Sequence, residues 1–363
     1  MRLLLAAAVF LCATAALGVH AASVQAKDEG ALTATELAVA KATRPSVVRV
    51  RWRDGRFGDV RSTRNAIVVR RDGLLVMAGL PPSRRGTFTA RLSDGRELRA
   101  QIVGSDTETA LTVLRLPTTG LVPVKGAAAP PPPEGTKAPV PDLAPPALGT
   151  RVVMVTGDGA VAAGPVRAHG RHGRFVDPVA RSRKRTTALV GIALAAVDAD
   201  AGAPLLDARG RLQGLVAGRK DTLEAATGRV PPGLVTRPTP VEVVAVPAAV
   251  VRMAWPLIAR HGRLPRAGLG VETAQAEEAL RQHLGLETGG HVLQRLTPEG
   301  RAARAGLRRH DVIVAIDGRA FDPGTTLHDV LLPYRPGAQV ELGLIRGGQR
   351  LTVPVTLGER AAR

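Results

Sequence analysis

Side chains that could carry out covalent chemistry are sparse in this sequence. Attack on a carbonyl by a serine requires a hydroxyl, a base within hydrogen-bond reach and a carboxylate that orients the base. No histidine lies between Ser46 and Val124, and no serine follows Ser182. Cys12 is the only cysteine and lies in an apolar N-terminal stretch, so a chain cleaved after that stretch has no thiol. These residue types argue against nucleophilic catalysis.

Two histidines and two threonines are the other candidates for site chemistry. His169 and His172 could bind a metal, but they lie among arginines and have only Asp177 as a nearby carboxylate. Positive neighbours repel a cation. Thr186 and Thr187 could offer a hydroxyl, but β-branched residues in this context are typical of the start of a strand. We therefore expect no metal site and no cofactor.

The chain is strongly basic, with a formal net charge of +19. Its densest basic run contains Arg181, Arg183, Lys184 and Arg185. In a cytosolic protein this charge would favour nucleic acid as a partner. The N-terminal residues predict export, so we expect no nucleic-acid partner. The run is either a solvated loop or a contact for an anionic envelope surface or an acidic peptide, and the sequence leaves both open.

Residues 1–26 have the features of a secretory signal. Arg2 supplies the positive start, and Leu3 to Leu17 form an apolar run that is short for a membrane span. Residues suited to signal peptidase cleavage end at Ala21 and again at Ala26. We expect export to the periplasm or cell envelope.

The segment after the signal has the pattern of short antiparallel strands. Residues 37–124 alternate apolar and polar positions and contain Asp72-Gly73 and Asp94-Gly95, which are hairpin signals. Residues 125–148 are rich in proline, which removes the N–H groups that a central strand needs. The sequence predicts an antiparallel all-β unit, a sandwich or a barrel, over residues 37–124 and an extended linker over residues 125–148.

A second β-rich segment covers residues 149–247. Its predicted strands flank a basic loop, which we expect over residues 170–185. Residues 248–266 then form a linker helix with an apolar stripe that includes Val250 and Ile258, and Pro256 is expected to kink it.

The last module, residues 267–360, combines four motifs. It begins with GLGV, continues through AARAGLRRHDVIVAIDG and a helix followed by RPG, and ends in two strands joined at Gly347-Gly348. Together these motifs resemble a PDZ domain in the circular order found in secreted bacterial proteases.

The PDZ resemblance implies a groove for a peptide C-terminus. The peptide adds a strand to a sheet edge, and its carboxylate needs converging N–H donors, which glycines permit. The expected groove residues are Gly268, Leu269, Gly270, Val271, Leu327, Val330 and Leu331. The last three have the i, i+3, i+4 spacing of one helix face. The alternative is that the leucines serve only the core.

Three segments in the β-rich part match one family of proteases. They read DGLLVMAGLPP, GSDTETALTVLRL and DADAGAPLLD. They resemble the histidine, aspartate and serine segments of the HtrA/Deg family, with Leu80, Ala110 and Ala201 at the three triad positions. The resemblance covers about residues 37 to 359. It implies a mainly β fold, a chymotrypsin-like double β-barrel followed by an α+β PDZ domain, with the triad lost.

The sequence therefore predicts an exported pseudoprotease that binds polypeptide C-termini or unfolded proteins as an adaptor, scaffold or quality-control factor. Two alternatives stay open: an active HtrA-like endopeptidase that uses unrecognised groups, and a charge-driven binder of the anionic envelope surface. The family commonly forms trimers through an aromatic N-terminal segment. Here that segment offers only Trp52 and Phe57, so a homo-oligomer is left open.

Overall fold

A computed structural model gives the fold of the chain. It describes residues 31–53, 60–80, 86–128, 146–176, 183–194, 201–219, 241–321 and 325–360. The predicted signal sequence and residues 129–145 of the predicted linker lie outside these ranges. The chain divides into two compact units. The first contains residues up to 102, 114–128 and 145–248, and the second contains 103–113, 129–144 and 249–363.

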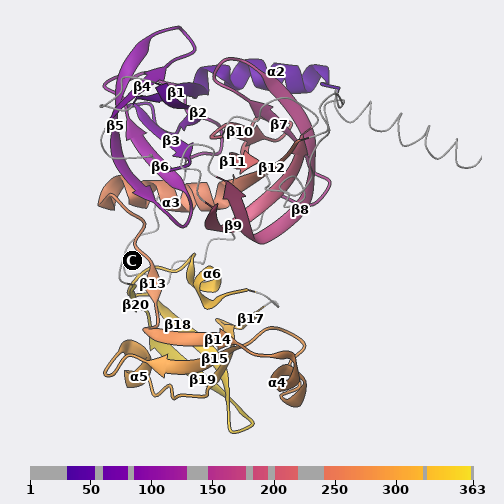
Figure 1. The fold of residues 1–363 in the computed structure, drawn as a ribbon, viewed down its shortest axis with the longest axis vertical. Coiled ribbons are helices and arrows are strands. Elements are labelled where there is room, and N and C mark those ends of the chain that lie inside the picture. Colours follow the sequence, from indigo (N-terminus) through magenta and orange to yellow (C-terminus); the bar gives the residue numbers. More distant parts are fainter. Residues whose placement is uncertain are drawn as a thin grey trace, which may run out of the picture. The chain divides into compact units, whose positions relative to one another are not determined.

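Six strands close the first barrel in the order β1-β2-β3-β6-β5-β4 (Figure 1). They are β1 Val47–Arg53, β2 Val60–Val68, β3 Leu74–Ala78, β4 Thr87–Arg91, β5 Glu97–Asp106 and β6 Leu111–Arg115. Alternate residues of a strand point to opposite faces, so Val48, Val50 and Trp52 enter the core of the barrel. Trp52 is therefore a core residue, and Phe57 lies outside the described residues.

A second closed barrel has the order β10-β11-β12-β9-β8-β7. Its strands are β7 Arg151–Val155, β8 Val161–Val176, β9 Arg183–Leu194, β10 Pro204–Leu206, β11 Leu212–Arg219 and β12 Val241–Pro247. The expected basic loop over 170–185 is wrong for most of its length. There β8 and β9 continue as a paired ribbon in which Arg174 is the register partner of Arg185. Ladder hydrogen bonds join backbone groups, so a polar sequence does not prevent the pairing.

One helix of the first unit was not expected from the sequence. The helix α2, Ala34–Thr43, begins with a capping box in which the Thr33 and Glu36 side chains each accept a hydrogen bond from the other residue's backbone. The buried Glu36 carboxylate also accepts a hydrogen bond from Arg151 Nε at 2.6 Å, which fixes α2 to β7. A single 3-10 turn, η1 Arg44–Ser46, leads into β1.

The expected linker helix is α3, Ala248–His261, which continues through Pro256. Its predicted stripe, from Val250 to Ile258, is buried. No helix among the described residues has both the length and the apolar character needed to cross a membrane.

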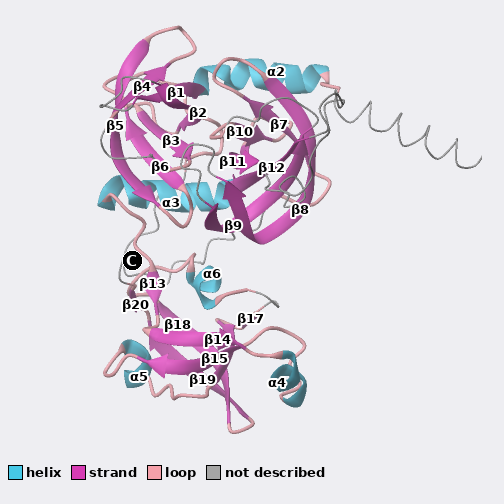
Figure 2. Ribbon diagram, viewed as in Figure 1, coloured by secondary structure: helices cyan, strands magenta, loops and turns pink. Residues whose placement is uncertain are grey.

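The second unit contains an α+β domain built on one antiparallel sheet (Figure 2). The sheet order is β14-β15-β16-β18-β19, with β17 paired to β16, and β13 pairs separately with β20. The strands are β13 Ala267–Gly268, β14 Val271–Gln275, β15 His291–Leu296, β16 Val312–Ile316, β17 Arg319–Ala320, β18 Gln339–Arg346, β19 Gln349–Thr356 and β20 Gly358–Glu359. The helices are α4 Glu278–His283, α5 Arg301–Arg304 and α6 Leu327–Leu331.

Candidate functional site

Two of the three positions predicted to be degenerate triad positions lie in the first unit. Leu80 follows β3 and is buried, and Ala201 lies just before β10 and is also buried. The Ala201 carbonyl accepts a hydrogen bond from the backbone N–H of Asn65 on β2 at 2.8 Å. The position expected for a nucleophile is thus attached through its backbone to the first barrel.

Asn65 joins the two barrels at a second point. Its side-chain Oδ1 accepts a hydrogen bond from the backbone N–H of Gly157 at 2.8 Å, and the residue is fully buried. A Cβ added to Gly202 would lie 1.8 Å from the Asn65 carbonyl oxygen, and Gly202 has φ +87. Only glycine fits that conformation and that approach.

The third triad position, Ala110, lies in the second unit on the turn between β5 and β6. Its backbone is left-handed, with φ 53, and its side chain is buried. The turn is held by Asp106, whose Oδ2 accepts hydrogen bonds from the Thr109 N–H at 2.8 Å and the Thr109 hydroxyl at 2.7 Å. Asp106 therefore organises the turn that carries Ala110.

The three predicted triad positions offer only hydrocarbon side chains. Neither a methyl nor an isobutyl group can accept a proton or attack a carbonyl. Asp200, which precedes Ala201, lies outside the described residues. Among the residues that are described, no group of three or more His, Cys, Asp or Glu side chains could hold a metal ion.

The glycine loop of the predicted groove lies between β13 and β14. Gly270 is exposed and has φ +71, and its carbonyl accepts a hydrogen bond from Thr297 N–H at 2.9 Å. Leu269 is buried in the domain core, whereas Val271 is partly buried against that core. Gly268 pairs with Gly358 and thereby joins β13 to β20.

The groove helix α6 is short and capped. Thr326 and Asp329 form a capping box at its start, with Thr326 N–H donating to Asp329 Oδ2 at 2.8 Å. Leu327 and Leu331 belong to the core that contains Leu269, and Val330 packs against that core while partly exposed. Of the predicted apolar groove residues, Val271 and Val330 are the two that keep accessible surface.

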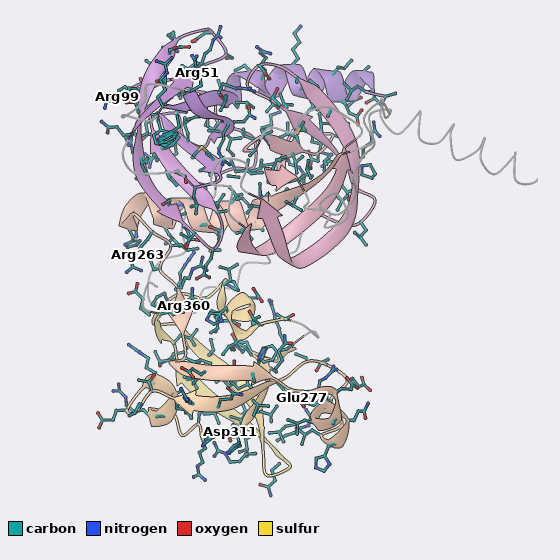
Figure 3. The ribbon with its side chains drawn as sticks, in the orientation of Figure 1. Arg51, Arg99, Arg263, Glu277, Asp311 and Arg360 are labelled. Atoms are coloured by element: carbon teal, nitrogen blue, oxygen red, sulfur yellow. The ribbon has the colours of Figure 1, made fainter. Side chains whose placement is uncertain are left out.

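Ion pairs, of which Arg266–Asp106 is the buried one, hold the start of the glycine loop within the second unit. Arg266, which precedes β13, places Nη2 2.6 Å from Asp106 Oδ2 and Nη1 3.2 Å from Glu108 Oε2. Arg360, which follows β20 and is labelled in Figure 3, also pairs with Glu108. Since β13 and β20 are paired, both ends of this small sheet attach to the turn organised by Asp106.

A buried histidine lies beside the groove helix, and the sequence analysis did not identify it. The His291 ring meets Phe321 edge to face at 5.1 Å between ring centroids. Burial lowers the pKa of His291 from 6.5, while a hydrogen bond to the Thr325 backbone and the nearby Asp329 charge oppose this shift. His328 lies close enough to lower the pKa further. His291 thus connects β15 to the residue before the α6 cap.

The domain that contains the predicted groove residues matches a known family. The PDZ domain family model covers residues 267–357. Over 310 residues the chain is 25% identical to a probable periplasmic DegP-like serine endoprotease from Halomonas elongata. The aligned region covers 84% of this chain and 58% of that relative. It is 26% identical to the serine endoprotease DegS of Escherichia coli K12 over 278 residues, 75% of this chain and 69% of DegS.

The chain is an HtrA-family serine protease homologue with a C-terminal PDZ domain. This HtrA homologue spans only 58% of the length of the DegP-like relative. The HtrA-type protease AlgW with a tripeptide has the same fold, with a TM-score of 0.62 at 23% identity over 90% of this chain and 98% of that one. A serine endoprotease from Yersinia pestis gives a TM-score of 0.58 at 19% identity over 91% of this chain and 100% of that one.

The predicted basic run is only partly described in this HtrA homologue. Arg183, Lys184 and Arg185 begin β9, and Arg181 lies outside the described residues. Asn65 and the Arg266–Asp106 pair, like His291, were missed by sequence reasoning. Their partners are distant in the chain, and no local motif marks them. The local capping signal of α2, Thr33 followed by Glu36, was available in the sequence.

Proposed function

We propose that this HtrA homologue is an exported, non-catalytic protein that binds polypeptide C-termini or unfolded segments through its PDZ domain. It would act as an adaptor, scaffold or quality-control factor. Export is supported by the signal features of residues 1–26 and by a relative named as periplasmic. The loss of catalysis is supported by the side chains of Leu80, Ala110 and Ala201.

One arrangement supports peptide binding more than any other. Strand β14 is an edge strand of the sheet: among the described strands it pairs with β15 alone. Its other side can therefore accept the strand of a bound peptide. The glycine loop leads directly into this strand, and Gln275 at its end donates to the Thr325 carbonyl just before α6 at 3.4 Å. Loop, edge strand and helix are therefore adjacent, as capture of a terminal carboxylate and an apolar last residue requires.

Peptide binding is tested with fluorescent peptides that end in an apolar residue and a free carboxylate. We expect saturable binding that is lost when the carboxylate is amidated. Val330→Lys should weaken binding, because it places a charge against the groove. Val292→Lys is the matched control, since Val292 is also a partly buried valine of the same domain but packs against a different cluster. Equal binding of free and amidated peptides would contradict the proposal.

The competing function is that of an active endopeptidase, because the relatives are named as such. Their triad chemistry would need a hydroxyl and an imidazole at positions that here carry alanine and leucine. Cleavage assays on the purified full chain decide between the two functions.

A further inference from the structure

The outer surface of the first barrel carries a group of arginines that belong to neither the triad positions nor the PDZ groove. On β1, Val48, Val50 and Trp52 enter the core, so the intervening arginines face outward. Arginines also occupy outward positions on the neighbouring strands. The arginine face consists of Arg49, Arg51, Arg53, Arg91 and Arg99.

Strand register brings these arginines together from three strands. Arg49 on β1 is the direct register partner of Arg91 on β4. In the adjacent row, Arg51 pairs with Thr89 on β4, and Thr89 pairs with Arg99 on β5. Figure 3 shows Arg51 and Arg99 on this side of the barrel. Directly opposed positions have Cβ atoms about 5 Å apart, so the arginine positions on β1, β4 and β5 form one two-dimensional array on the sheet.

The array has too few carboxylates to neutralise it. Arg51 pairs with Glu97, and Arg49 Nη1 lies 2.9 Å from Asp158 Oδ2. Arg91 and Arg99 are exposed, and no described residue forms an ion pair with either of them. Like charges directly opposite on a sheet are unfavourable, and Arg49 and Arg91 are such a pair. Asp158, which pairs with Arg49, and Glu97, the register partner of Arg91 on β5, are the two carboxylates described beside the five arginines, so they offset the positive charge only in part. An anion bound over the array would relieve this repulsion.

We propose that the arginine face is a docking surface for the phosphate headgroups of an anionic membrane. Guanidinium groups bind phosphate oxygens bidentately. The face offers no edge for peptide strand addition, because β1 and β4 are each paired on both sides. The large exposed apolar residues of the described chain, Leu37, Val122 and Leu148, lie on other segments. Contact is therefore made by charge at the membrane surface and not by insertion.

This inference is independent of peptide capture by the PDZ domain, because it uses residues of the first unit alone. The arginine face is also a different surface from the basic run at residues 181–185, which was the sequence-based candidate for an anionic surface. The structure describes the side chains of the arginine face and the carboxylates that pair with them.

Vesicle sedimentation tests the proposal with the full mature chain. We expect binding to vesicles of phosphatidylcholine mixed with phosphatidylglycerol, no binding to phosphatidylcholine alone, and loss of binding as salt rises. The double variant Arg91→Gln and Arg99→Gln should weaken binding by about tenfold or more. The double variant Arg91→Lys and Arg99→Lys should keep most of it, because charge is retained.

The matched control is Arg309→Gln with Arg350→Gln, two exposed arginines of the PDZ domain. It removes the same net charge and should leave vesicle binding unchanged. Unaltered thermal melting of all variants checks their folding. Equal losses in the face and control variants would overturn the proposal, since binding would then follow net charge alone. Failure of the unmodified chain to bind phosphatidylglycerol vesicles would also overturn the proposal. If the chain then bound polyglutamate, the arginine face would be a site for acidic polypeptides and not for membranes.

Discussion

The backbone N–H of Asn65 donates to the carbonyl of Ala201 at 2.8 Å, which joins the first barrel to the position that the sequence predicts for the nucleophile of a serine protease. Asn65 also accepts from Gly157, so one buried residue of β2 contacts the second barrel twice. In this HtrA homologue the position predicted for the nucleophile carries an alanine, and its backbone is bonded to the first barrel. Its backbone contacts contribute to the packing of the two barrels.

Replacing Asn65 should therefore cost stability. Asn65→Ala leaves the partly buried Gly157 N–H without its side-chain acceptor, which we expect to lower the free energy of unfolding by about 1–3 kcal/mol. Urea denaturation followed by circular dichroism measures the change. Gln101→Ala, which removes an exposed amide from β5, should stay within about 0.5 kcal/mol. An unchanged unfolding midpoint for Asn65→Ala would show that the hydrogen bond from Gly157 to Asn65 does not contribute to stability.

The purified chain should not cleave casein above background. A serine protease triad acts as a unit whose loss removes about a million-fold in turnover. Single restorations, Ala201→Ser or Leu80→His, should therefore add no measurable cleavage. Robust cleavage by the unmodified chain would show an active endopeptidase and end the pseudoprotease proposal.

Two ion pairs of equal length should differ strongly in what they contribute. Arg266–Asp106 and Arg263–Glu359 are both 2.6 Å long, but the side chains of the first are 12% and 8% exposed and those of the second 50% and 45%. Arg266→Ala leaves a buried carboxylate without its ion partner and should cost on the order of 3 kcal/mol. Arg263→Ala should cost less than about 1 kcal/mol. Chemical denaturation of the two variants gives the comparison, and similar losses would contradict it.

Acidification should destabilise the PDZ domain through His291. Burial lowers its pKa below the 6.5 of an exposed imidazole, so below pH 6.5 the unfolded chain binds a proton that the folded chain resists. The contribution of neutral His291 to the free energy of unfolding is therefore fully present above pH 6.5 and falls as the pH drops toward the folded-state pKa.

Denaturant unfolding at pH 7 and pH 5 measures this effect. His291→Gln should have a smaller pH dependence than the natural chain. His283→Gln, at an exposed histidine of α4, should leave the dependence unchanged. The Asp and Glu side chains with lowered pKa values lose their contribution only at more acidic pH. Parallel pH profiles for all three proteins would exclude His291 as the source.

The sequence by itself determined the features that depend on neighbouring residues. The turns at Asp72-Gly73 and Asp94-Gly95 form because glycine accepts a positive φ, which is 90 at both Gly73 and Gly95. The alternation on β1 predicted a buried valine face, and the GLGV motif predicted the loop that precedes β14. The hydrocarbon side chains of Leu80, Ala110 and Ala201 were also known at this level, because no fold gives a hydrocarbon group a hydroxyl or an imidazole.

Only the tertiary structure decided which distant residues meet. Asn65 with Ala201, Arg266 with Asp106, and Arg49 with Arg91 are pairings set by strand order and register, which no local pattern encodes. The same reason explains the wrong expectation for residues 170–185. The residue pattern there indicated a solvated basic loop, but β8 and β9 extend the barrel ladder because each supplies the other's backbone hydrogen bonds. Burial, and with it the lowered pKa of His291, likewise follows from packing and not from residue type.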